Sequence, residues 1–459
     1  MTLTTDSVQK TVYLMNLGCP KNVVDGEVML GLLAREGYTL SLDPEQAEVL
    51  MVNTCSFIDE AKEESIDAIF ELARYKANTP TKRLIVTGCL AQRYGRELQE
   101  ALPEVDIFVG TGEFLRITDI LKKKRELFAG SAAYIGAAHI LPDHNIPRIA
   151  TTPFYTAYLK VAEGCNHKCA FCIIPKIRGR QESRPIDSLI AEAEMLATQG
   201  VKELNLIAQD LTAYGRERRD GTTLLSLLRT LCRVEGIDWI RLLYCYPNYL
   251  DEPLLRLIAE EEKICSYLDM PLQHISDRML RAMRREKSGE GIRRLLDHLR
   301  IYIPRLVLRT SFIVGFPGEQ EEDFRQLHDF VAEVQLDHVG VFRYSQEEET
   351  PAGILPNQVP EEIKQERWRQ LMEQQRQVVR RKNLALVGSE QEVLFCGQDD
   401  RGRLWGRTRG QAPDIDGTVL LDRVLAEAGE IFVARITGVS GYDLRARQLQ
   451  EEREKHPSD

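Results

Sequence analysis

The stretch Glu163-Gly-Cys165-Asn-His-Lys-Cys169-Ala-Phe-Cys172 decides how this sequence is interpreted. Its cysteines are separated by three and then by two residues, a spacing that lets three thiolates wrap one 4Fe–4S cluster and leaves the fourth iron open. A zinc knuckle with His167 as its fourth ligand is one alternative, but His167 lies between the first two cysteines, which is poor geometry for tetrahedral zinc. A ferredoxin-like electron carrier would need a fourth cysteine close by. The motif therefore predicts an iron–sulfur cluster with one open iron.

The chain around this motif predicts a partial (β/α) barrel of the TIM type. From Tyr155 to about Gln358, apolar runs of strand length alternate with helical patterns. The predicted strands are Tyr158–Val161, Glu203–Ala208, Trp239–Leu243, Tyr267–Met270, Leu306–Val314 and His338–Phe342. Loops after the strands build the active face of such a barrel, and the cysteine motif follows the first strand. An open iron at that face can bind the amine and carboxylate of S-adenosylmethionine, whose reductive cleavage needs the low potential that such clusters reach.

The N-terminal part of the chain predicts a doubly wound parallel α/β domain. Three apolar runs are each followed by a cysteine and then by a helical pattern: Thr11–Leu17, Ala47–Val52 and Arg83–Val86. Parallel strands present their carboxyl ends at one edge of a sheet, where ligands bind, so Cys19, Cys55 and Cys89 are expected to meet there. Their thiolates could hold a second cluster, again with one iron open. The alternatives are chance spacing and buried thiols that act as small apolar side chains.

The remaining segments complete a plan of three domains. Residues 131–152 are irregular and contain Pro142 and Pro147, which predicts a linker. Glu361–Asn383 has apolar residues at helical spacing, which predicts an amphipathic helix on the barrel. Short β runs with glycine turns between Gly388 and Arg445 predict a small antiparallel β-barrel of the oligonucleotide-binding type. The predicted bounds are 10–140 for the N-terminal domain, 151–380 for the central barrel, 384–446 for the small barrel and 447–459 for a charged tail.

Composition and charge narrow the class of protein further. The chain has 459 residues, 10 cysteines and a formal net charge of −10. The first residues are polar and no run of about 18 apolar residues occurs, so neither a signal peptide nor a transmembrane helix is expected, and the expected location is cytoplasmic. In that compartment grouped cysteines indicate metal binding or catalysis instead of disulfides. The negative net charge gives no support to nucleic-acid binding, although a local basic patch would still allow it.

The cysteine motif resembles that of the radical S-adenosylmethionine superfamily, and the residues around it resemble one branch, the methylthiotransferases. Members of that branch carry an N-terminal domain with three spaced cysteines, then the radical barrel, then a small β-barrel called a TRAM domain. This sequence is similar to those parts, in that order, from about residue 10 to residue 445. The phrases that resemble the family's second-cluster sites are Leu17-Gly-Cys19-Pro-Lys-Asn22, Asn53-Thr-Cys55 and Thr87-Gly-Cys89.

The resemblance implies S-adenosylmethionine as a cofactor and two 4Fe–4S clusters, one on Cys165, Cys169 and Cys172 and the other on Cys19, Cys55 and Cys89. The cofactor contacts it points to are Gln209, Arg309, Phe171 and Gly315. An arginine such as Arg309 can pair with the methionyl carboxylate, and a glycine such as Gly315 permits close approach to adenine. Ordinary caps and turns would explain the same residues equally well. Three further arginines face either the ligands or solvent: Arg178, Arg180 and Arg184. No catalytic side chain is assigned.

Several phrases resemble the RimO branch of this family, which modifies an aspartate of ribosomal protein S twelve, more than the branch that modifies an adenosine of tRNA. They are Lys160-Val-Ala-Glu-Gly164, Cys172-Ile-Ile-Pro-Lys-Ile-Arg-Gly-Arg180, Asp269-Met-Pro-Leu-Gln-His274 and Gln411-Ala-Pro-Asp-Ile-Asp-Gly417. The charge of the C-terminal segment also favours the RimO branch. Residues 384–444 contain ten Asp and Glu, six Arg and no Lys, which gives a net charge of −4. An acidic barrel suits a basic ribosomal protein, whereas one that binds tRNA should be basic. Arg401, Arg403, Arg407 and Arg409 form a local basic stretch that keeps the tRNA alternative open.

The resemblance also implies a radical reaction. One S-adenosylmethionine methylates a sulfur held at the second cluster, and another is split to a deoxyadenosyl radical. That radical removes hydrogen from the aspartate β-carbon, which then takes the methylthio group. The cofactor carries this step, because side-chain acid–base catalysis cannot break an unactivated C–H bond.

The implied partners follow from that reaction. They are ribosomal protein S twelve, met by the TRAM domain, a low-potential electron donor such as flavodoxin or ferredoxin, and a sulfide donor. No membrane is expected to take part, and the protein is expected to be a monomer. Two alternatives stay open: a methylthiotransferase that acts on a modified adenosine of tRNA, and an iron–sulfur electron carrier with an RNA-binding barrel.

Overall fold

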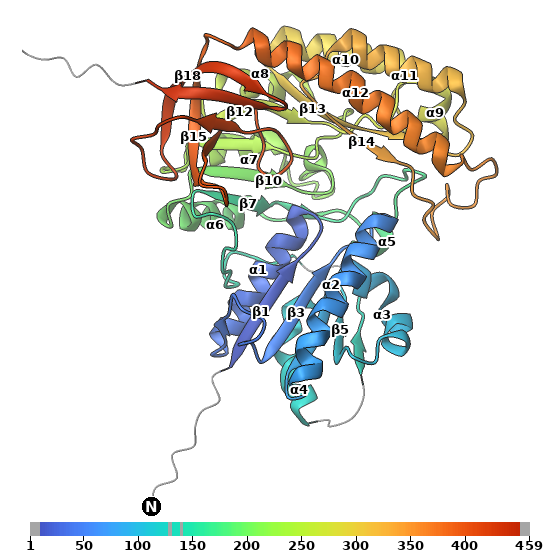
Figure 1. Cartoon of the computed structure of the whole chain (residues 1–459), viewed down its shortest axis with the longest axis vertical. Helices are drawn as coiled ribbons and strands as arrows, with labels where there is room; N and C mark the ends of the chain where they lie inside the picture. The colour runs from blue at the N-terminus through green and yellow to red at the C-terminus, as the bar shows by residue number, and fades with distance from the viewer. Residues whose placement is uncertain (1–9, 127–130, 138–140, 450–459) are drawn as a thin grey trace, which may run out of the picture.

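The computed structural model describes residues 10–126, 131–137 and 141–449. Three bodies follow one another along the chain: an α/β unit, a β/α barrel and a small β-barrel. Figure 1 shows the α/β unit below the β/α barrel, with the small β-barrel packed on the barrel's side. The predicted α/β class with three parts is confirmed.

The N-terminal unit is built on a six-stranded parallel sheet in the order β2-β1-β3-β4-β5-β6. Its strands are β1 (Thr11–Asn16), β2 (Thr39–Leu40), β3 (Val49–Thr54), β4 (Arg83–Gly88), β5 (Ile107–Val109) and β6 (Ala132–Tyr134). Its helices are α1 (Pro20–Arg35), α2 (Asp59–Asn78), α3 (Cys89–Ala101), η1 (Phe114–Arg116) and α4 (Ile117–Glu126). Val49 and Met51 of β3 pack with α1 and α4, whereas Leu50 and Val52 pack with α2 and α3. Helices on both faces confirm the doubly wound arrangement.

The central body is a parallel six-stranded barrel sheet in the order β14-β13-β12-β11-β10-β7. Its strands are β7 (Thr156–Lys160), β10 (Glu203–Ile207), β11 (Trp239–Leu242), β12 (Ile264–Asp269), β13 (Val307–Val314) and β14 (His338–Arg343). The outer helices are α6 (Ile186–Thr198), α7 (Leu224–Leu231), α8 (Glu252–Glu260), α10 (Gly289–Tyr302), α11 (Glu321–Val334) and α12 (Glu361–Ala385). Over the described residues β14 does not pair with β7, so the barrel is a partial one, as predicted.

Several short elements lie at the mouth of the barrel. A two-stranded antiparallel ribbon joins β8 (Ala162–Glu163) and β9 (Glu182–Ser183), and it frames the loop that carries the cysteine motif. The other short elements are α5 (Ile174–Ile177), η2 (Leu211–Ala213) and α9 (Asp277–Ala282). The ribbon therefore holds the two ends of the motif loop next to β7, the first barrel strand.

The interior of the barrel is shared by all three bodies. Leu204 and Leu206 of β10 pack outward against the helices, whereas Ile207 of the same strand belongs to an inner cluster. That inner cluster also contains Val24 of α1 and Leu394 of the small β-barrel. Because α1 packs directly against β7, the N-terminal unit is held against the open side of the barrel.

The C-terminal body is a closed barrel in the order β15-β16-β17-β19-β18. Its strands are β15 (Glu390–Gln398), β16 (Leu404–Thr408), β17 (Val419–Leu421), β18 (Ile431–Ser440) and β19 (Asp443–Gln448). The β17–β19 pair is parallel, so the predicted antiparallel barrel is antiparallel in its other pairs only. The last strand reaches Gln448, two residues into the predicted charged tail, and residues 450–459 of that tail lie outside the described residues.

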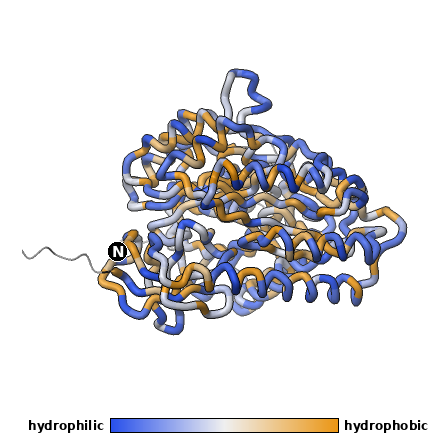
Figure 2. The backbone as a smooth tube through the Cα atoms, turned by 90° about the horizontal axis from the view of Figure 1, so that it is seen from above, coloured by the Kyte–Doolittle hydropathy of each residue, from blue (hydrophilic) through white to orange (hydrophobic). Residues whose placement is uncertain are grey.

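The predicted linker needs one correction. Ala132–Tyr134, at its start, form the edge strand β6, because their backbone pairs with β5. Within the rest of that segment, residues 138–140 lie outside the described residues. Figure 2 shows hydrophilic positions alternating with apolar ones along the outer helices, as expected for amphipathic helices on a core. None of the helices in the described ranges is long and apolar enough to cross a membrane.

Candidate metal centre

Cys19, Cys55 and Cys89 lie at the ends of three neighbouring strands. Cys19 comes directly before α1, Cys55 directly follows β3, and Cys89 is the first residue of α3. The strands that precede them, β1, β3 and β4, are adjacent and parallel, so the three cysteines share one edge of the sheet. A methyl group at Gly18, where φ is +84°, would lie 2.8 Å from Cβ of Cys55, so glycine allows these two turns to approach.

Burial dominates the chemistry of these thiols. Burial, together with the neighbouring Cys89 and Cys19, raises the pKa of Cys55 to about 12. Burial also raises the pKa of Cys89, although the charge of Arg178 opposes it. The thiols are free of disulfides. In the absence of metal Cys55 and Cys89 therefore favour the thiol form, and their thiolate form is expected only when a metal displaces the proton.

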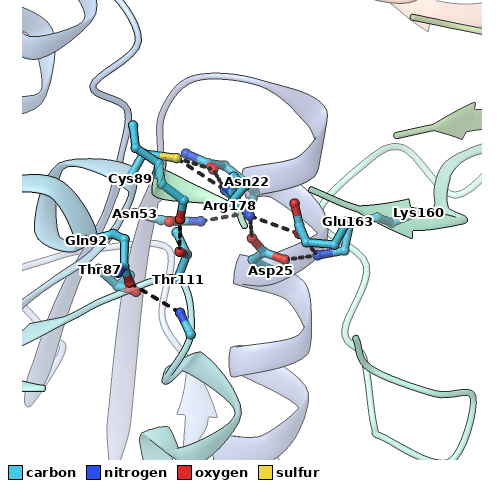
Figure 3. A network of polar contacts seen from close by, with 12 residues as sticks. Asn22, Asp25, Asn53, Thr87, Cys89, Gln92, Thr111, Lys160, Glu163 and Arg178 are labelled. Atoms are coloured by element: carbon cyan, nitrogen blue, oxygen red, sulfur yellow. Dashed lines mark hydrogen bonds and ion pairs between the residues drawn. The ribbon is translucent and has the colours of Figure 1, made fainter. Parts of the chain in front are cut away.

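Arg178 ties the first cysteine group to the barrel (Figure 3). This residue follows α5, and its Nη2 donates to Sγ of Cys89 at 3.4 Å and to Oδ1 of Asn22. Its Nη1 donates to Oδ2 of Asp25 at 2.6 Å and to Oε2 of Glu163 at 3.1 Å. Asn22 and Asp25 belong to α1, whereas Glu163 stands two residues before Cys165. One guanidinium thus touches both the N-terminal unit and the entrance to the cysteine motif.

Lys160 completes this buried network. Its Nζ donates to Asp25 and, at 2.8 Å, to Oε2 of Glu163. Burial acts to raise the pKa of Glu163, but Lys160 and Arg178 outweigh it and lower the pKa to about 2. Both carboxylates are therefore paired with both cations across the contact between α1 and the barrel, as Figure 3 shows. Pairing of this kind is what allows charges to remain in a buried interface.

Cys165, Cys169 and Cys172 form the second group, on the loop after β8. Burial raises the pKa of Cys165 to about 11 and that of Cys172 to about 12, and the neighbouring thiols of the group raise both. The only positive side chain that bonds to a sulfur here, within the described residues, is Arg285, whose Nη1 donates to Sγ of Cys169 at 3.6 Å. Its Nη2 donates to the carbonyl of Pro271 at 2.7 Å, which fixes the guanidinium at the mouth.

Over the described residues no three Cys, His or carboxylate side chains converge closely enough to hold one metal ion. A 4Fe–4S cluster instead takes one thiolate at each of its separate corners, and so needs ligands that stand further apart. Each group supplies three thiols and no fourth, which matches a cluster with one open iron. The ligand roles of both groups stay predictions.

The side chain of His167 is engaged by two residues outside the cysteine motif. Its ring stacks on Tyr246 with centroids 3.8 Å apart and an interplanar angle of 15°. Its Nε2 lies 2.6 Å from Oδ2 of Asp210. Because the side chain is already held between a ring and a carboxylate, the zinc-knuckle alternative finds no support in this geometry.

Of the predicted cofactor contacts, Gln209 and Phe171 lie at the mouth. Nε2 of Gln209 donates to Oε1 of Glu163, while its own Oε1 is buried and accepts no hydrogen bond from the described residues. A buried acceptor of this kind calls for a donor such as the ammonium group of S-adenosylmethionine. Phe171 lies inside the motif and packs with Met283 and Phe316. The buried Oε1 of Gln209, which lacks a hydrogen-bond donor among the described residues, is thus the observation that best fits binding of S-adenosylmethionine.

The other two predicted contacts are engaged elsewhere. Arg309 donates to Oδ1 of Asp269 at 3.1 Å and lies 3.4 Å from Oδ1 of Asp416, which belongs to the C-terminal body. Gly315 has φ of +75°, and a methyl group there would collide with the side chain of Lys364. The ion pair with the C-terminal body explains Arg309, and the close approach of Lys364 to the turn explains Gly315. Cofactor binding by these two residues stays an untested prediction.

The three arginines after the motif have different surroundings. Arg178 and Arg184 are both buried, whereas Arg180 is exposed. Arg184 pairs with Glu192 at 2.6 Å and belongs to the packing of α6. Sequence reasoning missed the roles of Lys160 and Arg285. A charged residue inside the apolar run of β7 was an available signal for Lys160, because a buried strand lysine must find a partner.

Family models match each of the three bodies. Residues 11–110 match the model described as "Uncharacterized protein family UPF0004". Residues 159–331 match "Radical SAM superfamily", and residues 387–449 match "TRAM domain". The fold and the cysteine motif thus define a radical SAM protein, a class whose members bind a 4Fe–4S cluster and S-adenosylmethionine.

Similarity to named relatives extends over nearly the whole chain. The chain is 51% identical over 438 residues to "Ribosomal protein uS12 methylthiotransferase RimO" of Pelobacter propionicus, covering 95% of this chain and 97% of that protein. It is 50% identical to the protein of the same name from Geotalea uraniireducens, covering 95% and 98%. The chain belongs to the RimO family of radical SAM methylthiotransferases.

Solved structures agree on the fold. A radical S-adenosylmethionine methyltransferase, TsrM from Kitasatospora setae with cobalamin and a 4Fe–4S cluster bound, superposes with a TM-score of 0.55 at 16% identity and covers 75% of this chain and 77% of that one. The cobalamin-dependent radical enzyme OxsB gives a TM-score of 0.50 at 12% identity, covering 76% of this chain and 55% of the other. At such identities the likeness concerns the fold alone.

Proposed function

We propose that this protein transfers a methylthio group to the β-carbon of an aspartate in ribosomal protein uS12. The names of the relatives support the reaction and the substrate. The observation that carries the proposal is that Arg178 bonds both to Cys89 and to Glu163, two residues before Cys165. A reaction that needs a radical source and a sulfur source on the same carbon requires two such centres side by side.

Each cysteine group has its own part in the proposal. Cys165, Cys169 and Cys172 would hold one 4Fe–4S cluster with S-adenosylmethionine, and Cys19, Cys55 and Cys89 a second cluster. When bound, these groups supply the radical and the sulfur, chemistry that side chains do not provide. The orphaned Oε1 of Gln209 supports its contact with the cofactor.

The chain's own residues hold these groups and keep water away. Arg178 and Arg285 donate to one sulfur in each group, which fixes the thiolates and offsets their charge. The α1 helix closes the open side of the barrel, and its Asp25 is paired with Lys160 there. A closed and dry mouth protects reactive species from side reactions.

The proposal extends to partners and organisation. The acidic C-terminal body suits a basic ribosomal protein. A low-potential electron donor such as flavodoxin or ferredoxin, a sulfide donor, a cytoplasmic location and a monomeric state belong to the same proposal, as do functional units at 10–140, 151–380 and 384–446.

The test is an anaerobic reaction of the reconstituted protein with S-adenosylmethionine and a reductant. A peptide of the uS12 target loop and an unmodified anticodon-stem RNA are offered in parallel, and both are analysed by mass. A methylthio group on the peptide aspartate alone is the expected result. A methylthio group on the RNA alone would overturn the substrate. A protein with both clusters loaded that forms no deoxyadenosine would overturn the radical mechanism.

A further inference from the structure

Lys21 is a buried cation at the junction of the two cysteine groups. It stands two residues after Cys19 in the first turn of α1, and its exposure is only 5%. Its Nζ lies 2.8 Å from the ring centroid of Tyr244, on the loop after β11 of the barrel. The side chain therefore reaches from the N-terminal unit into the mouth of the barrel.

The ammonium group of Lys21 has no acidic partner in the described parts of the chain. The nearby acids are already engaged: Glu163 and Asp25 pair with Lys160 and Arg178. Asp269 pairs with Arg309 and accepts from the backbone N–H of Tyr244 at 3.1 Å. No carboxylate, carbonyl or hydroxyl of the described residues accepts a hydrogen bond from Lys21.

An ammonium group that is largely removed from water and has no acceptor is costly, and a ring face satisfies one side of it only. An ammonium group has three donors to place and no acceptor of its own. The position of Lys21 thus calls for an anion that the chain itself does not supply.

The location of Lys21 narrows the choice of anion. Cys19 of the first cysteine group, and Asp269 and Glu163 of the barrel, all lie close enough to Lys21 to act on its charge. In the proposed reaction the substrate carbon loses hydrogen at one cysteine group and receives sulfur from the other. That carbon therefore has to lie between the two groups. In the proposed reaction that carbon is bonded directly to the carboxylate of the target aspartate.

We infer that Lys21 binds the side-chain carboxylate of the target aspartate and so determines specificity for an acidic side chain. This inference rests on the proposed function. The carboxylate would accept from the free donors of the ammonium group while the ring of Tyr244 covers its other side. A neutral target side chain would leave the cation unpaired, which is how a buried polar group rejects a substrate that lacks its partner.

The test compares Lys21→Met with Lys21→Arg and with a matched control. Methionine keeps the length and the apolar contact with Tyr244 but removes the charge, whereas arginine keeps the charge. Lys202→Met is the control, because Lys202 lies before β10 and pairs on the surface with Asp238 at 3.3 Å. Iron content, affinity for S-adenosylmethionine, and affinity for uS12 loop peptides with Asp or Asn at the target position are measured on the loaded, anaerobic proteins.

Lys21→Met is expected to keep its iron and its affinity for S-adenosylmethionine. Its affinity for the Asp peptide should fall about 10- to 100-fold, the loss of a charged hydrogen bond. Its affinity for the Asn peptide should change little, so that discrimination between the two peptides collapses. Lys21→Arg should recover part of that discrimination, and Lys202→Met should behave like the wild type.

Other outcomes would overturn the inference in distinct ways. Loss of S-adenosylmethionine affinity with unchanged peptide binding would assign Lys21 to the methionyl carboxylate. Loss of iron would assign it to the first cysteine group, and unchanged discrimination would leave it as a ring contact only. A wild-type protein that discriminates between the peptides but leaves both unmodified would overturn the proposed function instead, and a wild type that binds neither would overturn both.

Discussion

Arg178 donates a hydrogen bond through Nη2 to Sγ of Cys89 at 3.4 Å, although the two residues are 89 positions apart and belong to different bodies of the chain. The same guanidinium pairs with Asp25 and Glu163. A sulfur of the N-terminal unit is therefore held by a side chain of the barrel. The first cysteine group is completed only when the two bodies dock.

Replacing Arg178 by methionine should remove iron from the first cysteine group and loosen the docking of the N-terminal unit. The change leaves Asp25 and Glu163 with Lys160 as their one cation, and breaking a buried pair costs about 3–5 kcal/mol. We expect a lower free energy of unfolding and about half of the wild-type iron, since one of two similar clusters is lost. Denaturant unfolding and iron analysis measure the two effects. Arg180→Met is the matched control, because Arg180 is exposed. Full iron in Arg178→Met would contradict the expectation.

Single cysteine substitutions should separate the two groups. Cys165→Ala should abolish cleavage of S-adenosylmethionine and keep the iron of the other group. Cys19→Ala should keep cleavage but abolish methylthio transfer, because the radical source remains and the sulfur source is lost. Deoxyadenosine formation and peptide mass report the two activities. Cys232→Ala, at a cysteine of neither group, should retain both activities. Transfer by Cys19→Ala at the wild-type rate would exclude a role for the first group.

The sequence was sufficient to predict features that depend on local spacing or on sheet topology. Cys165, Cys169 and Cys172 are close in sequence, so their spacing alone indicates a shared cluster. Cys19 and Cys55 are distant in sequence, but parallel strands must place their carboxyl ends at one edge. In the first case local spacing fixes the positions of the side chains, and in the second the topology of the sheet does.

The rest of the site depends on docking, which no local rule describes. The contact between Lys160 and Asp25 spans 135 positions and exists because α1 packs on β7. The contact of Arg309 with Asp416 likewise exists only because a loop of the C-terminal body reaches the barrel. The parallel β17–β19 pair likewise follows from closure of the small barrel and not from the pattern of either strand.

His274 should make the protein sensitive to acid. Burial lowers the pKa of His274 from 6.5 to about 3, and its Nδ1 accepts from the backbone N–H of Ser276 at 3.0 Å. The unfolded chain then binds a proton that the folded chain does not, so this contribution to stability is complete above about pH 6.5 and is lost as the pH falls toward about 3. His274→Asn keeps an acceptor but cannot titrate.

Between about pH 7 and pH 5 the variant His274→Asn should therefore lose less free energy of unfolding than the wild type, by about 1–2 kcal/mol. Denaturant unfolding at several pH values measures the difference. His298→Asn, at an exposed histidine of α10, should lose as much as the wild type. Parallel pH profiles for wild type and His274→Asn would show that the folded protein protonates His274 readily.

Glu203 should anchor the C-terminal body to the barrel. Its carboxylate pairs with Arg407 of β16 and, at 2.9 Å, with Arg241 of β11, and all three side chains are buried. Burial acts to raise the pKa of Glu203, but the two guanidinium groups outweigh it and lower the pKa to about 2. The change Glu203→Gln keeps the shape of the side chain but leaves two buried cations without a counter-charge, which should cost about 3–5 kcal/mol.

The same substitution in an exposed pair separates docking from general effects of lost charge. Glu390 pairs with Arg435 at the surface of the small barrel, so Glu390→Gln should cost less than about 1 kcal/mol. Limited proteolysis should release the C-terminal body faster from Glu203→Gln than from Glu390→Gln, because the former weakens its attachment and the latter does not. Equal release from both variants would show that the apolar contact of Leu394 with the barrel interior is enough to hold the C-terminal body in place.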